Sequence, residues 1–259
     1  MQHELNGKTA VVTGAGRGIG LAIATALADE GALIVAGTRG PSPGLEALAR
    51  KAAVRIQYVD LGTAEGPERL VAAAGDTIDV LVNNVGFAPA RPGGFLSVTD
   101  EDWLATFTLN TLAAIRTTRA ALPVMLAGGG GSIVTVSSVN AGFPDPVVID
   151  YSAAKAALSA FSKALSKEVA GHGVRVNTIS PGPVATDLWN GAGGVAETLG
   201  AAGGTRPEDI ADAVAQSLPT GRFSRPDEVA DLAVLLAGAR SANITGADFR
   251  IDGGMVPTW

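Results

Sequence analysis

The sequence predicts one α/β domain in which helices cover both faces of a seven-stranded parallel sheet. Short runs of β-branched residues alternate along the chain with longer segments rich in Ala and Leu. Several of the short runs are apolar at nearly every position, which is typical of parallel strands covered on both faces. The length of 259 residues is also common for an undivided α/β protein. We therefore expect a single doubly wound domain spanning residues 1–259.

The individual elements follow from the same pattern. Helical length and composition predict four main helices, and Gly31 is placed to end the first of them. The Gly/Ala-rich tract at 191–204 is open to two interpretations, a domain linker or a mobile loop; we favour a loop because the strand and helix pattern resumes after it. The expected strands are centred on 11–12, 33–35, 54–56, 80–82, 133–136, 174–176 and 249–251, and the expected helices are 21–29, 100–126, 151–170 and 227–236.

Composition excludes several classes of protein. Hydrophobic residues make up 47% of the chain and charged residues 17%, so the chain is globular rather than disordered. The net charge of -6 argues against a protein that binds nucleic acid. The chain has no cysteine, and its two histidines, His3 and His172, lie far apart in sequence, so we expect no metal site. No segment has the pattern of a signal peptide or a membrane span, and we expect a cytoplasmic protein.

A glycine-rich turn occupies residues 13–20, TGAGRGIG, between the first strand and the first helix. Glycine lets the backbone turn tightly and approach a pyrophosphate, and the N-terminus of the following helix presents N–H groups to it. The spacing of Gly14, Gly18 and Gly20 differs from the Gly-x-Gly-x-x-Gly fingerprint. The turn by itself is therefore equally compatible with a dinucleotide site and with a glycine-rich turn that binds nothing.

A second group of residues is more specific. Tyr151 and Lys155 are four positions apart in an expected helix, so both project from one face. An ammonium beside a phenol lowers the pKa of the phenol, and we expect Tyr151 to exchange protons near neutral pH. Ser138 follows an apolar strand, at the sheet edge where open α/β sheets bind ligands. An isolated Tyr-x-x-x-Lys pair would more often decorate a surface helix.

The motifs that occur in order along the chain resemble those of the short-chain dehydrogenase/reductase family over nearly the whole length. The resemblance implies a Rossmann fold and an NAD(P)-dependent oxidoreductase similar to ketoreductases and 3-oxoacyl reductases. One departure is visible, Val85 where the family usually has Ala, and it affects no catalytic position. The matching segments are 13–20 (Thr-Gly-x-x-x-Gly-x-Gly), Asp60, 83–86 (Asn-Asn-Val-Gly for Asn-Asn-Ala-Gly), Asn110, Ser138, Tyr151, Lys155, 181–182 with Thr186, 244–246 and 252–254.

The resemblance also implies roles for these residues. Tyr151 is expected to be the general acid and base, Lys155 to depress its pKa and hold the nicotinamide ribose, and Ser138 to hydrogen-bond the substrate oxygen. Asn110 is expected to anchor a water that links Lys155 to solvent. The expected catalytic residues are thus Asn110, Ser138, Tyr151 and Lys155. The expected cofactor-binding residues are Gly14, Arg17, Gly18, Ile19, Gly20, Thr38, Arg39, Asp60, Leu61, Asn84, Gly86, Tyr151, Lys155, Pro181, Gly182, Val184 and Thr186.

The residues after the second strand indicate which cofactor is used. Relatives that prefer NAD resemble one another in carrying an acid there, whereas this chain has Gly37, Thr38 and Arg39. Arg39 and Arg17 are suited to pair with a 2′-phosphate, and Thr38 to hydrogen-bond it. We therefore expect NADP(H), with NAD(H) as the alternative if both arginines are simply solvated.

The sequence indicates less about the substrate than about the cofactor. In the family that the chain resembles, the segment after Thr186 closes over the substrate, so we expect a lid loop at about 187–222. Trp189 suggests an apolar lid, although packing within its own loop or on a neighbouring subunit explains it equally well. Asp145 and Asp150 could instead select a polar group or simply serve turns. Apolar residues beside the motifs favour a hydrophobic ketone or secondary alcohol; they are Phe87, Phe143, Pro144 and Val147.

Two alternatives remain open for the activity. One is the NAD-dependent oxidation of a sugar or polyol, and the other is a dinucleotide-binding protein without catalysis. We favour the enzyme because all four catalytic positions are filled. The resemblance further implies a homo-oligomer, a tetramer or a dimer, that uses the helix of Tyr151 and the helix before it.

Overall fold

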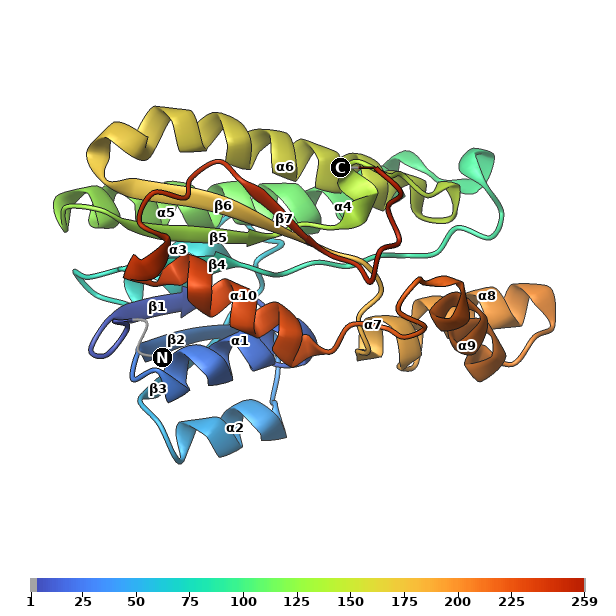
Figure 1. Ribbon diagram of the computed structural model, residues 1–259, viewed down its shortest axis with the longest axis horizontal. Helices are drawn as coiled ribbons and strands as arrows, with labels where there is room; N and C mark the ends of the chain where they lie inside the picture. Colours follow the sequence, from blue (N-terminus) through green and yellow to red (C-terminus); the bar gives the residue numbers. More distant parts are fainter. Residues whose placement is uncertain (1–3, 259) are drawn as a thin grey trace.

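The computed structural model describes residues 4–258, which form a three-layer α/β domain around one seven-stranded parallel sheet (Figure 1). The strand order is β3-β2-β1-β4-β5-β6-β7, as expected for a doubly wound fold. The strands are β1 Thr9–Val12, β2 Leu33–Thr38, β3 Val54–Tyr58, β4 Val80–Asn83, β5 Gly131–Val136, β6 Val174–Pro181 and β7 Asp248–Ile251. All seven strands predicted from the sequence are confirmed.

Helices lie on both faces of the sheet because the strands alternate their apolar side chains between two cores. The register pairs Val11 with both Val35 and Leu81, and Leu81 with Ile133, so these side chains form a row on one face. This face is covered by α3 Gly66–Ala72, α5 Ala113–Ala127 and α6 Ile149–Val169, and the other face by α1 Gly18–Asp29, α2 Pro43–Ala49 and α10 Pro226–Ala237.

The four expected helices are present with small changes. The first is α1, which ends at Asp29, and Gly31 follows with a φ of 86° that favours glycine. The expected helix 100–126 is divided into α4 Asp100–Phe107, the π-helical turn η2 Thr108–Leu112 and α5. The helices α2 and α3 were not expected from the sequence, because each has only seven residues.

The interpretation of the Gly/Ala-rich tract 191–204 and of the lid at 187–222 as a loop was wrong. Much of this segment is helical, with α7 Asp187–Asn190, α8 Val195–Gly203 and α9 Pro207–Ser217. Pro207 occupies the first turn of α9, and Gly204 ends α8 in a left-handed conformation. The glycines between the helices hid these short helical segments in the sequence. The three helices project beyond one end of the sheet (Figure 1).

Neither a metal cluster nor a membrane span is found within residues 4–258. No group of three or more potential metal-binding side chains occurs there, and His172 is exposed, while His3 lies outside the described residues. None of the helices in this range is both long and apolar enough to cross a bilayer.

Candidate active site

A large cavity lies at the carboxyl edge of the sheet, where the chain reverses its winding direction between β1 and β4. Its volume is about 760 Å³, and residues from both halves of the chain line it. Parallel α/β sheets bind their ligands at such a switch point. The cavity contains both groups of residues that the sequence singled out, the glycine-rich turn and the pair Tyr151 and Lys155.

The glycine-rich turn forms the floor of one end of the cavity. Gly14 and Gly18 have φ values of 64° and 54°, which favour glycine. A Cβ on Gly20 would lie 2.2 Å from the carbonyl oxygen of Gly14, so only glycine fits there. Arg17 precedes α1 in an extended conformation, and no side chain caps the helix. The N-terminal N–H groups of α1 are therefore available for a pyrophosphate, and this turn fits a dinucleotide.

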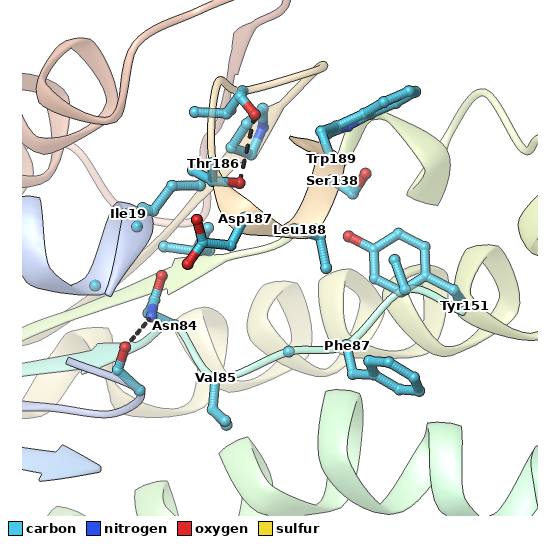
Figure 2. Close-up of a pocket in the computed structure, with 18 of the residues that line it drawn as sticks. Ile19, Asn84, Val85, Phe87, Ser138, Tyr151, Thr186, Asp187, Leu188 and Trp189 are labelled. Carbon is cyan, nitrogen blue, oxygen red and sulfur yellow. Dashed lines mark hydrogen bonds between the residues drawn. The ribbon is translucent and has the colours of Figure 1, made fainter. Parts of the chain in front are cut away.

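Asn84 joins the end of β4 to this turn. Its side-chain nitrogen donates hydrogen bonds to the carbonyl oxygens of Thr13 at 3.0 Å and Gly14 at 3.2 Å (Figure 2). Asn84 thus fixes the floor of the cavity. Asp60, expected near the adenine, is exposed and does not line the cavity, whereas its neighbour Leu61 does. The Asp60 carboxylate accepts a hydrogen bond from the Gly62 N–H at 2.9 Å, so its contact with a cofactor stays a prediction.

The end of β2 forms the part of the cavity suited to a 2′-phosphate. Thr38 and Arg39 line it, and the segment 37–42 contains no acidic side chain. Arg17 lines the same cavity with its side chain 74% exposed, and its guanidinium lies 3.7 Å from the Asp187 carboxylate. Ser42, which the sequence analysis missed, donates a hydrogen bond to the Gly16 carbonyl at 2.5 Å and caps α2. Ser42 follows two turn residues, a position at which serine often caps the N-terminus of a helix, and this pattern in the sequence was the available signal.

The carboxyl end of β6 closes the cavity on the opposite side. The expected residues Pro181, Gly182, Val184 and Thr186 all line it, together with Ile19 from the start of α1. A Cβ added to Gly18 would lie 3.3 Å from the methyl group of Thr186, so the two residues are in close contact. The segment that follows Thr186 therefore begins in contact with the glycine-rich turn.

Ser138, Tyr151 and Lys155 come together from two elements. Ser138 follows β5 and is 8% exposed, and Tyr151 and Lys155 occupy successive turns of α6. The Tyr151 hydroxyl is directed toward Ser138 (Figure 2). The Lys155 Nζ lies 5.7 Å from the centroid of the Tyr151 ring and donates a hydrogen bond to the Val136 carbonyl at 2.9 Å. The structure therefore brings the three residues together in the lining of one cavity.

The proton affinities differ from the expectation. Burial raises the pKa of Tyr151 to about 12, and a hydrogen-bonding interaction with Ser138 lowers it only in part. Burial also lowers the pKa of Lys155 to about 8. The expected tyrosine pKa near neutrality is thus not found in this structure, because desolvation of the phenolate outweighs the stabilisation by its neighbours.

Asn110 lies behind the cavity rather than in its lining. It is fully buried in η2, where its Nδ2 donates to the carbonyls of Phe87 at 2.8 Å and Thr106 at 2.9 Å, and its Oδ1 accepts from the Phe87 N–H at 3.1 Å. A Cβ on Gly86 would lie 3.0 Å from the Asn110 Oδ1 and 3.4 Å from the Lys155 Nζ. Asn110 therefore holds the loop that follows β4, and its role in anchoring a water stays a prediction.

The wall beside Ser138 and Tyr151 contains polar groups. Asn140, Asp145 and Val147 line it. Asp145 caps the turn η4 Pro146–Val148 by accepting from the Val147 N–H at 2.9 Å, as a loop aspartate often does. The Asn140 backbone N–H donates to the Ser138 hydroxyl at 3.2 Å, but between residues 4 and 258 no hydrogen bond is found to the Asn140 side-chain amide or to the Asp145 Oδ2. These two polar groups are therefore available to a ligand.

The segment from α7 to α9 forms the opposite, apolar wall. Trp189 lines the cavity and also packs edge-on against Phe223, with ring centroids 5.2 Å apart, while its role in an apolar lid stays a prediction. Of the expected pocket residues, Phe87 and Val147 line the cavity, whereas Phe143 and Pro144 do not. Spatial proximity alone adds several residues that the sequence analysis missed; these are Val195, Leu199, Val214, Ser217 and Met255.

A glycine cradle for a dinucleotide next to a buried Ser, Tyr and Lys group is the site of a nicotinamide-dependent oxidoreductase. Comparison with known proteins agrees. A family model described as enoyl-(acyl carrier protein) reductase matches residues 14–256. The chain belongs to the short-chain dehydrogenase/reductase family.

The relatives include enzymes with different substrates. D-threitol dehydrogenase of Mycolicibacterium smegmatis is 38% identical, over 97% of this chain and 94% of the relative. The 3-oxoacyl-[acyl-carrier-protein] reductase FabG of Escherichia coli is 32% identical, over 97% of this chain and 98% of the relative. The solved structure of L-sorbose reductase from Gluconobacter frateurii, complexed with NADPH and L-sorbose, matches with a TM-score of 0.90 and 35% identity over 100% of both chains.

Proposed function

We propose that this protein reduces a ketone with NADPH and catalyses the reverse oxidation of a secondary alcohol, with Ser138, Tyr151 and Lys155 as catalytic residues. One observation carries the proposal: the three side chains meet inside the cavity whose floor is the glycine-rich turn. A dinucleotide-binding protein without catalysis has no need for a buried lysine, which is costly to desolvate.

The chain's own residues divide the chemistry as follows. A nicotinamide cofactor bound in this cavity would supply or accept the hydride. In the reducing direction the Tyr151 hydroxyl gives its proton to the substrate oxygen, and in the oxidising direction its phenolate takes that proton back. Ser138 donates a hydrogen bond to the substrate oxygen, on which negative charge develops. Lys155 stabilises the phenolate and holds the ribose hydroxyls.

NADP(H) is the cofactor that the residues after β2 fit. Thr38 and the exposed Arg39 line that end of the cavity, and no carboxylate of the segment 37–42 is present to repel a 2′-phosphate. The solved L-sorbose reductase, which contains NADPH, is similar over the whole chain. The ratio of kcat/KM with NADPH to that with NADH tests this preference, and equal values would contradict it.

The favoured substrate class is a small ketone that carries further hydroxyl groups, together with the corresponding polyol. The Asn140 side-chain amide and the Asp145 Oδ2 have no hydrogen-bond partner among the described residues, and they are suited to hydrogen-bond hydroxyl groups of a substrate. The names of two relatives, D-threitol dehydrogenase and L-sorbose reductase, agree with this class. A hydrophobic ketone is the second candidate, because Leu188, Trp189 and Met255 form an apolar wall.

A substrate panel separates these possibilities. NADPH consumption is followed at 340 nm with ketoses, cyclic and aryl ketones and β-keto esters, and NADP+ or NAD+ reduction with polyols. Tyr151→Phe is the catalytic control, and it should lower kcat by at least about 100-fold, as expected when a general acid is removed. Turnover of ketoses that falls in Asp145→Leu but not in Met255→Leu supports the hydroxylated substrate. The reverse pattern with an aryl ketone supports the hydrophobic one.

Three further features of the protein stay proposals: a lid over the cavity, a homo-oligomeric state and a cytoplasmic location. The segment from α7 to α9 acts as a lid, because its side chains line the cavity opposite Tyr151. The protein is a homo-oligomer, a tetramer or a dimer, and the exposed Phe95, Leu96 and Leu104 support an interface beside α4. Light scattering after size-exclusion chromatography tests the second point, and cell fractionation tests the expected cytoplasmic location.

A further inference from the structure

A largely covered arginine, Arg91, lies next to the active site but outside its cavity. Arg91 belongs to the loop that joins β4 to η1 Phe95–Ser97, and the same loop contributes Phe87 to the cavity. The Arg91 side chain is only 15% exposed. Its backbone N–H also donates to the Val147 carbonyl at 2.7 Å, so the loop is fixed to the segment that precedes α6.

The partner of this arginine is the residue directly before Tyr151. Asp150 is 0% exposed, and its Oδ2 accepts hydrogen bonds from the Arg91 Nη2 at 2.5 Å, the Arg91 Nε at 3.2 Å and the Thr106 hydroxyl at 2.7 Å. The Arg91 Nη1 also contacts the Asp102 carboxylate at 2.8 Å. Asp150 was considered from the sequence as a group that selects a polar substrate; this was wrong, because Arg91 and Thr106 bind its carboxylate away from the cavity.

These contacts connect the loop that follows β4 to both η2 and α6. Thr106 binds the Asp150 carboxylate through its hydroxyl, and its carbonyl accepts from the Asn110 side chain at 2.9 Å. Asn110 in turn holds both backbone groups of Phe87. The loop is thus held at Phe87 by η2 and at Arg91 by the first turn of α6. The first turn of α6 is the turn from which Tyr151 projects.

We propose that Arg91 and Asp150 are a positioning pair that orients Tyr151 against the Phe87 wall of the substrate cavity. Three hydrogen bonds to the Asp150 Oδ2 restrict the conformation of this side chain, and they connect the first turn of α6 to Arg91 and Thr106. Misplacing a catalytic group by about 1 Å can cost about 100-fold in rate. Burying two charges is expensive, and replacing such a pair with apolar residues is often neutral for stability, so folding alone does not explain it.

The kinetic test uses Arg91→Ala, Asp150→Asn and the double variant at a temperature where all are folded. The proposal rests on the ketoreductase activity proposed above. Each single variant should lower kcat by about 10- to 100-fold while the KM for NADPH changes less than threefold, because the glycine-rich turn is untouched. The double variant should have a kcat no lower than that of the slower single variant, since both substitutions remove the same contact between Arg91 and Asp150. Lys8→Ala, which breaks the exposed Lys8–Asp79 pair, is the matched control and should leave kcat unchanged.

A second measurement needs no substrate. Chymotrypsin cleavage after Phe87, detected by mass spectrometry, should be at least tenfold faster in Arg91→Ala than in the wild type or in Lys8→Ala. If the wild-type protein turns over no ketone, the proposed function fails, while faster cleavage still supports the attachment of the loop. Arg91→Lys covers the case in which Arg91→Ala does not fold, and it should lose three- to tenfold in kcat because one ammonium cannot replace the guanidinium contacts.

Two outcomes would overturn the proposal. The first is folded variants, Arg91→Lys included, with kcat within twofold of wild type and an unchanged rate of cleavage after Phe87. The second is a loss of kcat accompanied by an equal rise in the KM for NADPH and faster cleavage at sites throughout the chain, since this pattern indicates general destabilisation rather than positioning.

Discussion

Replacing Gly20 with Ala should weaken cofactor binding much more than the added methyl group suggests. The new Cβ would lie 2.2 Å from the Gly14 carbonyl oxygen and 2.4 Å from the Asn84 side-chain nitrogen. Real Cβ atoms stay at least 3.0 Å from such neighbours, so the start of α1 must move by about 0.8 Å relative to Gly14. The Gly14 contact is to the backbone, and no side-chain rotation relieves it.

The size of the effect follows from this displacement. A shift of about 0.8 Å breaks an N–H to phosphate hydrogen bond of ordinary length, and a hydrogen bond to a charged group contributes about 1.5–3 kcal/mol. The Kd for NADPH should therefore rise about 10- to 150-fold for each bond lost. Overpacking should also lower the free energy of unfolding by about 1–3 kcal/mol.

NADPH fluorescence titration measures the affinity, and chemical denaturation measures the stability. Gly40→Ala is the matched control, because Gly40 lines the same cavity and has nothing within 4 Å of an added Cβ. That variant should keep wild-type affinity. A Kd for Gly20→Ala within threefold of that for Gly40→Ala would refute the reasoning, since the backbone contact would then have no influence on the cradle.

Three further predictions follow from the same structure. Lys155→Met removes the free-energy penalty of burying the Lys155 ammonium, which the wild type pays in full below pH 8 and loses toward pH 10.5. The free energy of unfolding of the wild type, measured by urea denaturation, should therefore rise by up to about 3 kcal/mol relative to that of the variant between pH 7 and 10.5. A constant difference across that range would contradict it. Arg39→Ala should lower kcat/KM for NADPH about 10- to 100-fold and leave that for NADH unchanged; an unchanged ratio would show that Arg39 does not meet the 2′-phosphate. Leu81→Ala should cost about 2–5 kcal/mol of stability because Leu81 is fully buried between strands, whereas Leu33→Ala, 36% exposed on β2, should cost less than about 1 kcal/mol, and equal losses would contradict the assigned core.

The sheet could be predicted from the sequence because its strands are both apolar and β-branched. Runs such as 80–82 and 133–136 are covered on both faces and carry no competing helical period. The helices of the lid could not be predicted in the same way. Helix α8 has only nine residues, and glycines on both sides of it are typical of a loop.

The placement of Tyr151 and Lys155, which we propose as catalytic, could be predicted because their spacing is local. Tyr151 and Lys155 are one helical turn apart, and this geometry is fixed once the helix forms. Their proton affinities could not be predicted, because burial by residues from other elements raises the pKa of Tyr151 and lowers that of Lys155. A pattern in the sequence names the groups, but their desolvation depends on the surrounding elements.

The sequence by itself therefore determined the doubly wound fold, the glycine-rich cradle and the identity of the Ser, Tyr and Lys group. Each depends on local properties: periodicity, backbone freedom and spacing within one helix. Only the tertiary structure decided that Asn110 and the Arg91–Asp150 pair support the active site from behind and that Met255 and the lid helices complete the cavity. The contacts between Arg91 and Asp150 join residues 59 positions apart in the sequence, and those between Phe87 and Asn110 join residues 23 apart. Such proximity arises only when the layers of the fold pack together.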